Sequence, residues 1–425
     1  MNVKALHQIF LKYPTVSTDT RNIVKNSIFF ALKGENFNGN TYASEALEKG
    51  ASYAIVDEKE YATSDKIILV NNVLETLQKL ANYHRNHNKA RVISLTGSNG
   101  KTTTKELINT VLAKKHKTIA TKGNLNNHIG VPLSLLSIQS DTEIAIIEMG
   151  ANHKKEIEFL CKIAEPDFGY ITNFGKAHLE GFGSEEGVIQ GKSELYNHLL
   201  TNEKNIFFNA DDLIQLNKLD SYIKKYGFSV NKPEHYIIEF IEANPFVQIK
   251  VEDTIVNSKL IGSYNFTNCA AAILIGKYFN IALEDIKSSI ENYIPDNNRS
   301  QIVEKNGHQI ILDAYNANPT SMKAALENFK ALEAENKIAF LGDMFELGNT
   351  ANEEHQNIAD LVHTMSFSKV YLIGENFDKT HTNLSTLKSF SDIETLIKNS
   401  PISKKSSILI KGSRGMKLER IVNIL

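Results

Sequence analysis

The stretch RVISLTGSNGKTTTKELINT, residues 91–110, decides the fold of this chain. Its apolar run at 92–95 predicts a buried strand. Glycines, a lysine and three threonines follow, and apolar side chains then return at helical spacing at Leu107, Val111 and Leu112. Strand, glycine-rich loop, lysine, hydroxyl residue and helix is the order of a phosphate-binding loop. A plain glycine turn between a strand and a helix would explain the glycines, but not the lysine and threonines after them.

The chemistry of this loop favours a polyphosphate ligand. Glycines let backbone N–H groups crowd around phosphate oxygens, and the helix N-terminus adds partial positive charge. We expect Lys101 to neutralise the outer phosphates and the Thr102 hydroxyl to hold magnesium. The common pattern G-x-x-x-x-G-K-[ST] requires glycine at position 95, where this chain has Leu95, so a shorter G-x-x-G-K-T stands here. The predicted nucleotide-binding residues of the loop are Gly97, Ser98, Asn99, Gly100, Lys101, Thr102 and Thr103.

Length and composition indicate a globular protein of several domains. A chain of 425 residues predicts two to four domains. Its formal net charge of −2 gives no electrostatic reason to expect nucleic acid or an anionic membrane as partner. We expect no signal peptide and no membrane insertion, because no apolar run is long enough. Cys161 and Cys269 lack the spacing of metal ligands and indicate reduced thiols, so we expect a cytoplasmic protein. We also expect a monomer.

Three regions follow from the pattern of apolar runs, and the predicted fold class is α/β. Residues 1–88 predict a small α/β domain with strands at 27–32, 53–56 and 66–70, and the basic stretch 84–91 is the expected linker. Residues 89–296 form a central domain around the phosphate loop, with antiparallel strands expected over 206–262. Residues 297–425 repeat strand and helix, with strands at 308–315, 337–343, 369–375 and 407–414. This alternation predicts a doubly wound parallel sheet.

Polar residues at strand ends are the further site candidates. Glu148 ends the apolar run 143–150, where parallel sheets bind ligands and where it could help hold magnesium; it could also be a solvated strand end. His178 follows the predicted strand 168–173, which suggests a metal or phosphate role as well as a structural one. Lys192, taken alone, has the pattern of a surface charge. The residues expected to converge on one crevice of the C-terminal sheet are Asp313, Tyr315, Asn316, Asn318, Asp343, Lys411, Ser413 and Arg414.

Two further clusters are rich in turn-forming and amide side chains. The loop 121–132, TKGNLNNHIGVP, carries amides that donate and accept hydrogen bonds at once, which suits a carbohydrate or peptide ligand. The cluster Thr18, Asp19, Thr20 and Arg21 has ordinary turn chemistry on its own.

These motifs together resemble the Mur ligases of peptidoglycan synthesis, in the same order and over essentially the whole chain. The family's shortened loop matches 97–103, its E-[ML]-G-A-N-H stretch matches 148–153, and A-H-L-E-G-F-G matches 177–183. The stretches T-x-G-N-x-N-N-x-I-G-V-P at 121–132, D-x-Y-N-A-N-P-x-S-M at 313–322 and K-G-S-R at 411–414 discriminate within the family. The chain departs from the family at Tyr264, where histidine is often found, and at Asn298, where glycine is often found.

The resemblance implies an ATP-dependent amide ligase that adds D-alanyl-D-alanine to UDP-N-acetylmuramoyl-tripeptide through an acyl phosphate. It implies ATP and magnesium as cofactors, with Thr102 and Glu148 on one ion. It also implies that His178 and a carbamate on Lys192 hold a second ion. Whether the third residue of the acceptor peptide is lysine or diaminopimelate stays open.

Further site residues carry over from the family. On the nucleotide side they are Asn265, Asn268, Arg299, Asp313, Tyr315 and Asn316. On the substrate side they are Thr18, Asp19, Thr20 and Arg21 for the uridine part, Asn124, Asn126 and Asn127 for the peptidyl part, and Lys411, Ser413 and Arg414 for the dipeptide carboxylate or the growing peptide. A kinase or nucleotide switch would explain the phosphate loop but would leave the third domain unused. A non-catalytic scaffold would need none of Lys101, Glu148, His178 and Lys192.

Overall fold

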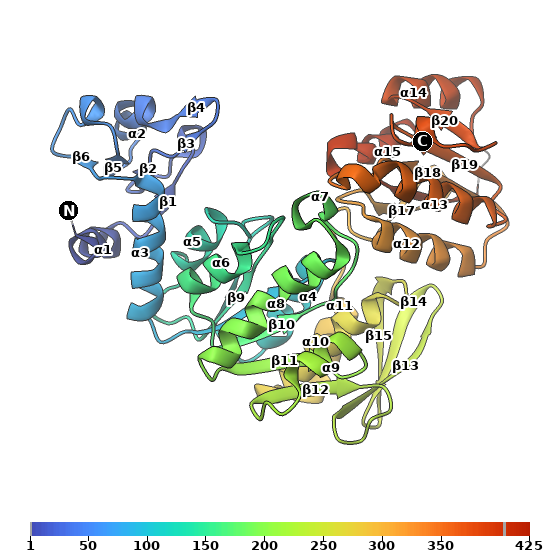
Figure 1. The fold of residues 1–425 in the computed structure, drawn as a ribbon, viewed down its shortest axis with the longest axis horizontal. Coiled ribbons are helices and arrows are strands. Elements are labelled where there is room, and N and C mark those ends of the chain that lie inside the picture. Colours follow the sequence, from blue (N-terminus) through green and yellow to red (C-terminus); the bar gives the residue numbers. More distant parts are fainter. Residues whose placement is uncertain (1, 403–404) are drawn as a thin grey trace.

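The computed structural model describes residues 2–402 and 405–425 and consists of three lobes, with the two outer lobes rising from the central one (Figure 1). The N-terminal lobe carries a parallel four-stranded sheet in the order β1-β2-β5-β6. Its strands are β1 (Val16–Ser17), β2 (Ile28–Phe30), β5 (Tyr53–Val56) and β6 (Ile67–Leu69). The three predicted strands are confirmed. The two-residue strand β1 is too short to leave a periodic signal.

Helix α3 (Val73–His87) joins the N-terminal lobe to the central lobe. The predicted linker at 84–91 is wrong for residues 84–87, because they belong to this helix. His84 and Arg85 are buried in the last turn of this helix. The helix ends at His87, and β7 begins at Arg91 and runs to Thr96, so only residues 88–90 connect the two. The helix packs against α1 (Val3–Lys12), α5 (Gly130–Leu135) and α6 (Glu156–Ala164). A basic stretch can therefore be helical and buried when distant segments supply its hydrogen-bond acceptors.

The central lobe is built on a nine-stranded sheet in the order β15-β14-β13-β12-β11-β10-β7-β9-β8. Its strands are β7, β8 (Thr118–Ala120), β9 (Ile144–Glu148), β10 (Phe168–Ile171), β11 (Asn205–Asn209), β12 (Lys225–Ser229), β13 (Tyr236–Ala243), β14 (Phe246–Val251) and β15 (Thr254–Ile261). The prediction of antiparallel strands over 206–262 holds only from β13 onward. Strands β11 and β12 instead extend the parallel part of the sheet.

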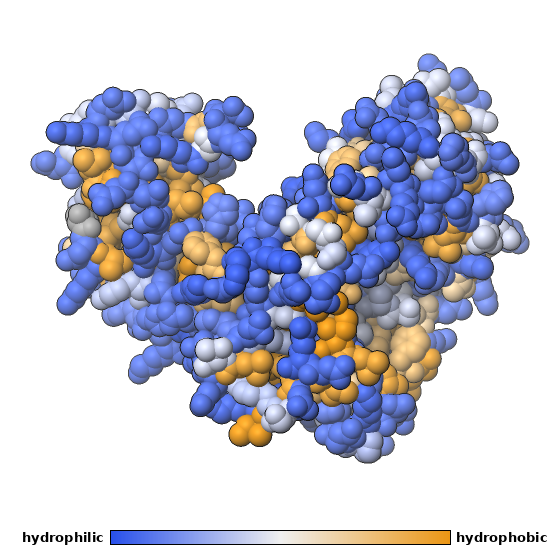
Figure 2. All heavy atoms as spheres, viewed as in Figure 1, coloured by the Kyte–Doolittle hydropathy of each residue, from blue (hydrophilic) through white to orange (hydrophobic). Residues whose placement is uncertain are grey.

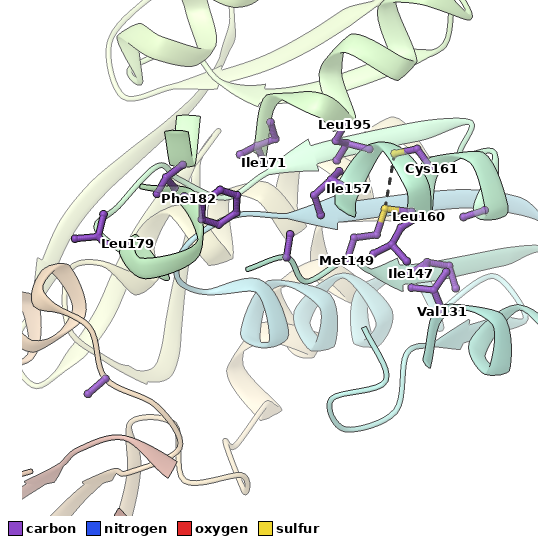
Figure 3. Close-up of a cluster of buried hydrophobic side chains, with 14 of the residues drawn as sticks. Val131, Ile147, Met149, Ile157, Leu160, Cys161, Ile171, Leu179, Phe182 and Leu195 are labelled. Carbon is purple, nitrogen blue, oxygen red and sulfur yellow. Dashed lines mark hydrogen bonds between the residues drawn. The ribbon is translucent and has the colours of Figure 1, made fainter. Parts of the chain in front are cut away.

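Both faces of the parallel core are covered by helices, which explains its near-continuous apolar strands. Ile93 and Leu95 lie in one core cluster with α4 (Lys101–Leu112), α10 (Asn265–Tyr278) and α11 (Leu283–Asn292). Val92 lies in the other cluster, with α5, α6 and α8 (Glu185–Thr201). Figure 3 shows part of this second cluster, where Cys161 of α6 packs on Met149 just after β9. Two short helices, α7 (Leu179–Phe182) and α9 (Leu213–Leu219), complete the lobe.

The C-terminal lobe has a six-stranded sheet in the order β16-β17-β21-β18-β19-β20. The four predicted strands are confirmed as β17 (His308–Asp313), β18 (Lys337–Gly342), β19 (Lys369–Ile373) and β21 (Ser407–Lys411). These four strands are parallel to one another. The outer strands β16 (Gln301–Lys305), which is antiparallel, and β20 (Ser385–Leu387) were not predicted. Its helices are α12 (Pro319–Ala331), α13 (Ala351–His363), α14 (Phe390–Asn399) and α15 (Ile421–Ile424).

Across residues 2–402 and 405–425, the structure contains no helix with the length and apolar character that crossing a membrane requires. The expected domain boundaries fall between elements: 88/89 lies between α3 and β7, and 296/297 lies between α11 and β16. Both cysteines are free and buried.

Candidate active site

A cavity of about 1460 Å³ lies where the three regions meet, and Figure 2 shows the molecule hollowed between its outer lobes. The first turn of α3, the phosphate loop, the Asn-rich loop and the strand ends of the C-terminal sheet all line it. The predicted site residues that line it are Ser98, Asn99, Gly100, Lys101, Thr102, Thr103, Asn124, Asn126, Asn127, Glu148, His178, Asn265, Asn268, Arg299, Asp313, Tyr315, Asn316, Asn318, Lys411, Ser413 and Arg414. Thr18, Asp19, Thr20, Arg21, Gly97 and Lys192 do not line it.

The backbone of the phosphate loop requires glycine at two positions, because a side chain at either one would clash with a neighbouring residue. Gly97 has φ +145°, and a Cβ atom there would lie 1.9 Å from the Thr172 hydroxyl. Gly100 has φ +80° and caps α4, and a Cβ atom there would lie 2.4 Å from the Asn268 side-chain oxygen. The backbone N–H of Asn99 is fixed by the side-chain oxygen of Asn173, at 3.0 Å. The loop is therefore preformed.

Lys101 folds back over this loop. Part of its side chain is exposed, but its ammonium group is buried and donates to the carbonyls of Gly97 at 2.7 Å and Ser98 at 3.2 Å. Burial lowers the pKa of Lys101 to about 8; the positive charge of Arg299 adds to this, and Glu148 opposes it. An anionic phosphate in the cavity would raise the pKa of this lysine again and replace its carbonyl partners.

Glu148, at the end of β9, is 1% exposed and faces the loop. Its carboxylate accepts from the Thr102 hydroxyl at 3.0 Å and from the Asn126 amide at 2.8 Å. Its backbone N–H donates to the Thr121 hydroxyl at 3.0 Å. A carboxylate beside a hydroxyl is the hard oxygen donor set that magnesium prefers, so these residues fit the predicted ion. Among the described residues, no group of three or more His, Cys, Asp and Glu side chains has the arrangement of a metal site.

Lys192 is fully buried, so the surface-charge interpretation is wrong. Its Nζ atom donates to the carbonyl of Ala151 at 2.9 Å and lies 4.9 Å from the centre of the Phe182 ring. Burial, together with the charge of Lys101, holds the pKa of Lys192 well below its ordinary value. This lysine is therefore a candidate for a neutral, nucleophilic amine.

His178 connects the site to the C-terminal lobe. It begins α7 with a left-handed φ of +53°. Its Nδ1 atom lies 2.5 Å from a carboxylate oxygen of Glu346, in a close contact that is not aligned as a hydrogen bond. The contact with His178 lowers the pKa of Glu346 below its ordinary value. Glu346 was missed in the sequence, since no local motif links it to a histidine 168 positions earlier.

The opposite wall carries the charged strand ends of the C-terminal sheet. Asp313 is paired with Lys411 at the ends of β17 and β21. Two guanidinium groups lie close to the Tyr315 ring, with Arg299 3.7 Å and Arg414 5.1 Å from its centre. Arg414 also donates to the Tyr315 hydroxyl at 3.2 Å. The predicted convergence of strand ends is thus confirmed for this group.

Asp343 is the exception among the residues expected in the crevice. It is 3% exposed, does not line the cavity, and accepts from the backbone N–H groups of Asn376 and Phe377, both at 3.0 Å. Its carboxylate anchors the loop after β19, so its predicted place in the site is wrong.

Hydrogen bonds hold several of the amide side chains that line the cavity in place. Asn268 accepts from the Thr104 hydroxyl at 3.0 Å and donates to the Asn265 side chain at 2.7 Å, which ties α10 to α4. The side-chain oxygen of Asn127 accepts from the backbone N–H groups of Ile129 and Gly130, where α5 begins. These bonds fix the amides that line the cavity.

The uridine candidates lie apart in the N-terminal lobe. Asp19 caps the short helix Thr20–Asn22 and pairs with Arg21 at 2.7 Å. Hydrogen bonds from Arg21 lower the pKa of Asp19 to about 2. The structure does not bring this cluster together with the cavity, and its ligand stays a prediction.

Three family models match the chain in sequence order. They are the Mur ligase family catalytic domain at 12–86, the Mur ligase middle domain at 95–276 and the Mur ligase glutamate ligase domain at 298–414. A UDP-N-acetylmuramoyl-tripeptide--D-alanyl-D-alanine ligase of Bacillus subtilis is 36% identical, with 96% of this chain and 92% of the relative covered. A MurF structure from Acinetobacter baumannii matches at 29% identity with a TM-score of 0.84, covering 96% of this chain and 92% of that one. A MurF ligase from Thermotoga maritima, solved in complex with ADP, matches at 27% identity with a TM-score of 0.84, covering 97% of each chain.

Proposed function

Because the chain belongs to the Mur ligase family, we propose that it joins D-alanyl-D-alanine to UDP-N-acetylmuramoyl-tripeptide, with ATP as the energy source, in the synthesis of peptidoglycan precursors. The observation that carries this proposal is the shared cavity. The preformed phosphate loop of the central lobe and the cationic strand ends of the C-terminal lobe face the same space. Relatives that span nearly the whole chain bear the name of this activity.

The reaction needs activation because a carboxylate is a poor electrophile toward an amine. Transfer of the terminal phosphoryl group of ATP to the tripeptide carboxylate gives an acyl phosphate and ADP. The amine of D-alanyl-D-alanine then attacks the acyl carbon, the phosphate leaves, and the amine loses a proton. Positioning and charge neutralisation drive such a transfer. The loop N–H groups and Lys101 are suited to both tasks.

Magnesium would sit at two places and would neutralise phosphate charge. Thr102 and Glu148 have the oxygen donors for one ion, as their mutual contact of 3.0 Å supports. His178 and a carbamate on Lys192 would hold the other. The lowered pKa of Lys192 supports the carbamate, because only a neutral amine adds to carbon dioxide. The added carboxylate would supply an anionic oxygen that the bare lysine lacks.

The substrate contacts divide between the lobes. Arg299 and Tyr315 would meet the nucleotide, together with Asn265, Asn268, Asp313 and Asn316. A guanidinium suits a carboxylate, so Arg414 and Ser413 would bind the dipeptide end, while Lys411 is already paired with Asp313. The amides Asn124, Asn126 and Asn127 would face the peptidyl part. Thr18, Asp19, Thr20 and Arg21 would hold the uridine.

The test is phosphate release, measured with each substrate omitted in turn. A ligase releases phosphate only when ATP, the UDP-linked peptide and D-alanyl-D-alanine are all present. A kinase would form ADP without releasing phosphate, and a nucleotide switch would release phosphate without the dipeptide, so either result would contradict the proposal. Lys101→Ala should abolish turnover with the fold intact. Lys192→Ala should do the same and regain part of its activity with added short carboxylates, and full activity in Lys192→Ala would remove the second-ion assignment.

A monomer and a cytoplasmic location stay predictions. Light scattering coupled to size exclusion tests the first, with one mass of about 48 kDa expected from the sequence mass of 47.6 kDa. Cell fractionation tests the second.

A further inference from the structure

The chain crosses from the central lobe to the C-terminal lobe between α11 and β16, and this crossing has an unusual backbone. Asn298 and Ser300 both adopt left-handed conformations, with φ of +56° and +51°. Asparagine tolerates this region, whereas serine enters it less readily. Between them stands Arg299, whose guanidinium stacks on Tyr315 and lines the cavity. The direction of Arg299 therefore depends on what holds its two neighbours.

Ser300 is held from both lobes. It is 6% exposed, and its backbone N–H donates to a carboxylate oxygen of Asp313 at 3.1 Å. Its hydroxyl lies 2.7 Å from the hydroxyl of Tyr264, which stands one residue before α10 in the central lobe. Asp313 is fixed in turn by Lys411. The Tyr264–Ser300 bond thus ties the central lobe to the segment that carries Arg299.

The position of Arg299 matters at the phosphate loop. Its positive charge contributes to the lowered pKa of Lys101, so the two cations act on the same space. A shift of the guanidinium would weaken the field that a nucleotide meets on the C-terminal side of the cavity. The cationic group would also lose its stacking on Tyr315.

We propose that Tyr264 is a positioning residue, which acts through the Ser300 hydroxyl to hold Arg299 over the nucleotide cavity. The inference rests on the proposed ATP site. It assigns a role to a residue at which this chain departs from its family, and to a serine outside the phosphate loop. Tyr264 also lines the cavity itself, so a direct contact with the nucleotide is the competing explanation.

The two explanations differ in a double-mutant cycle on the full-length enzyme. Tyr264→Phe and Ser300→Ala each remove one hydroxyl from the same bond. We expect each to weaken ADP binding with magnesium, measured by calorimetry, by about three- to tenfold, as loss of one hydrogen bond implies. The double variant should be no weaker than the worse single variant. KM for ATP should rise by the same factor, with a smaller change in kcat.

The control is Tyr236→Phe, which removes a tyrosine hydroxyl bonded to Glu252 at 2.7 Å on the exposed sheet of the same lobe. It should leave ADP binding unchanged. Normal binding in Ser300→Ala, or effects that add up in the double variant, would overturn the positioning role and favour direct contact. Absence of ADP binding in the unaltered enzyme would instead contradict the proposed function.

Discussion

The central lobe is joined to its two neighbours in different ways. Toward the N-terminal lobe, Leu77 and Leu80 of α3 belong to the same apolar cluster as Leu135 and Leu160 of the central lobe. The same cluster also includes Met344 and Leu347 of the C-terminal lobe, where the short helix α7 meets the turn at 348–350, and three polar contacts cross this junction as well. Asn99 meets Asn318 at 2.7 Å, Lys176 meets Glu354 at 2.8 Å, and Tyr264 meets Ser300 at 2.7 Å.

The difference indicates which junction can move. Separating α3 from the centre would expose apolar surface on two helices, α5 and α6, whereas separating the C-terminal lobe would part the short helix α7 from one turn and exchange polar contacts for water. We therefore expect the N-terminal junction to unfold with the central lobe and the C-terminal junction to open and close during turnover. A clamp of this kind would bring Arg299 and Tyr315 to the nucleotide only when closed.

The largest effect is expected at the N-terminal junction. Arg85 is 8% exposed and donates to the carbonyls of Ala164 and Glu165 and to the Asp167 carboxylate at 2.7 Å. Arg85→Ala takes the donor from the two carbonyls and leaves Asp167 with only the Val92 N–H group and Lys204, and it should lower the free energy of unfolding by about 3 kcal/mol in urea.

The matched control lies on the same helix. Lys79 pairs with Glu75 on the surface, and Lys79→Ala should change the free energy of unfolding by less than about 0.5 kcal/mol. Equal effects of the two variants would show that the junction does not depend on buried polar contacts.

A smaller effect is expected at the C-terminal junction. Lys176→Ala leaves Glu354, 7% exposed, without its cation when the lobes are docked, but the open form lets water reach that carboxylate. We expect a larger radius of gyration by X-ray scattering and a rise of about fivefold in KM for ATP. The free energy of unfolding should change by less than about 1 kcal/mol.

Lys162→Ala, which breaks an exposed pair with Glu158 on α6, is the control and should alter none of the three quantities. A loss of stability in Lys176→Ala without any change in scattering would mean that this junction is fixed as well.

The smallest effect concerns pH at the N-terminal junction. His7 lies 3.0 Å from the His84 ring, and burial lowers the pKa of His7 to about 4. The unfolded chain then binds more protons than the folded one between pH 4 and 6.5, so stability falls as pH falls through this window. We expect a loss of about 1 kcal/mol from pH 7 to 5, discounted for screening.

His7→Leu should flatten that slope in urea unfolding, whereas His381→Leu, at an exposed position, should keep it. An unchanged slope in His7→Leu would assign the acid sensitivity to other groups.

Local physics explains how much of the fold could be predicted. The parallel strands of the central and C-terminal sheets carry apolar runs, which predict them directly. The phosphate loop requires glycine at Gly97 and Gly100, and both positions hold it. Strands β11 and β12 were given the wrong partners because the mixed polarity of residues 206–262 does not reveal strand direction. The burial of His84 and Arg85 depends on backbone acceptors at Ile138 and Ala164, and the sequence around the two residues does not reveal these distant partners.

The site shows the same limit. Most residues at strand ends were placed correctly, since carboxyl ends of parallel strands share an edge. Lys192 was misread from its pattern because burial is a property of the packed fold, and Asp343 was misplaced because its partners lie 33 and 34 positions away. Glu346 and the Tyr264–Ser300 bond depend on how the lobes dock, which the order of residues does not encode locally.

The most direct test is a crystal structure of the enzyme with magnesium and a non-hydrolysable ATP analogue. We expect the triphosphate on the loop 97–103, with Lys101 turned from its carbonyl partners toward the outer phosphates and Arg299 facing them from the other lobe. An analogue bound elsewhere, with Lys101 still folded onto Gly97 and Ser98, would contradict it.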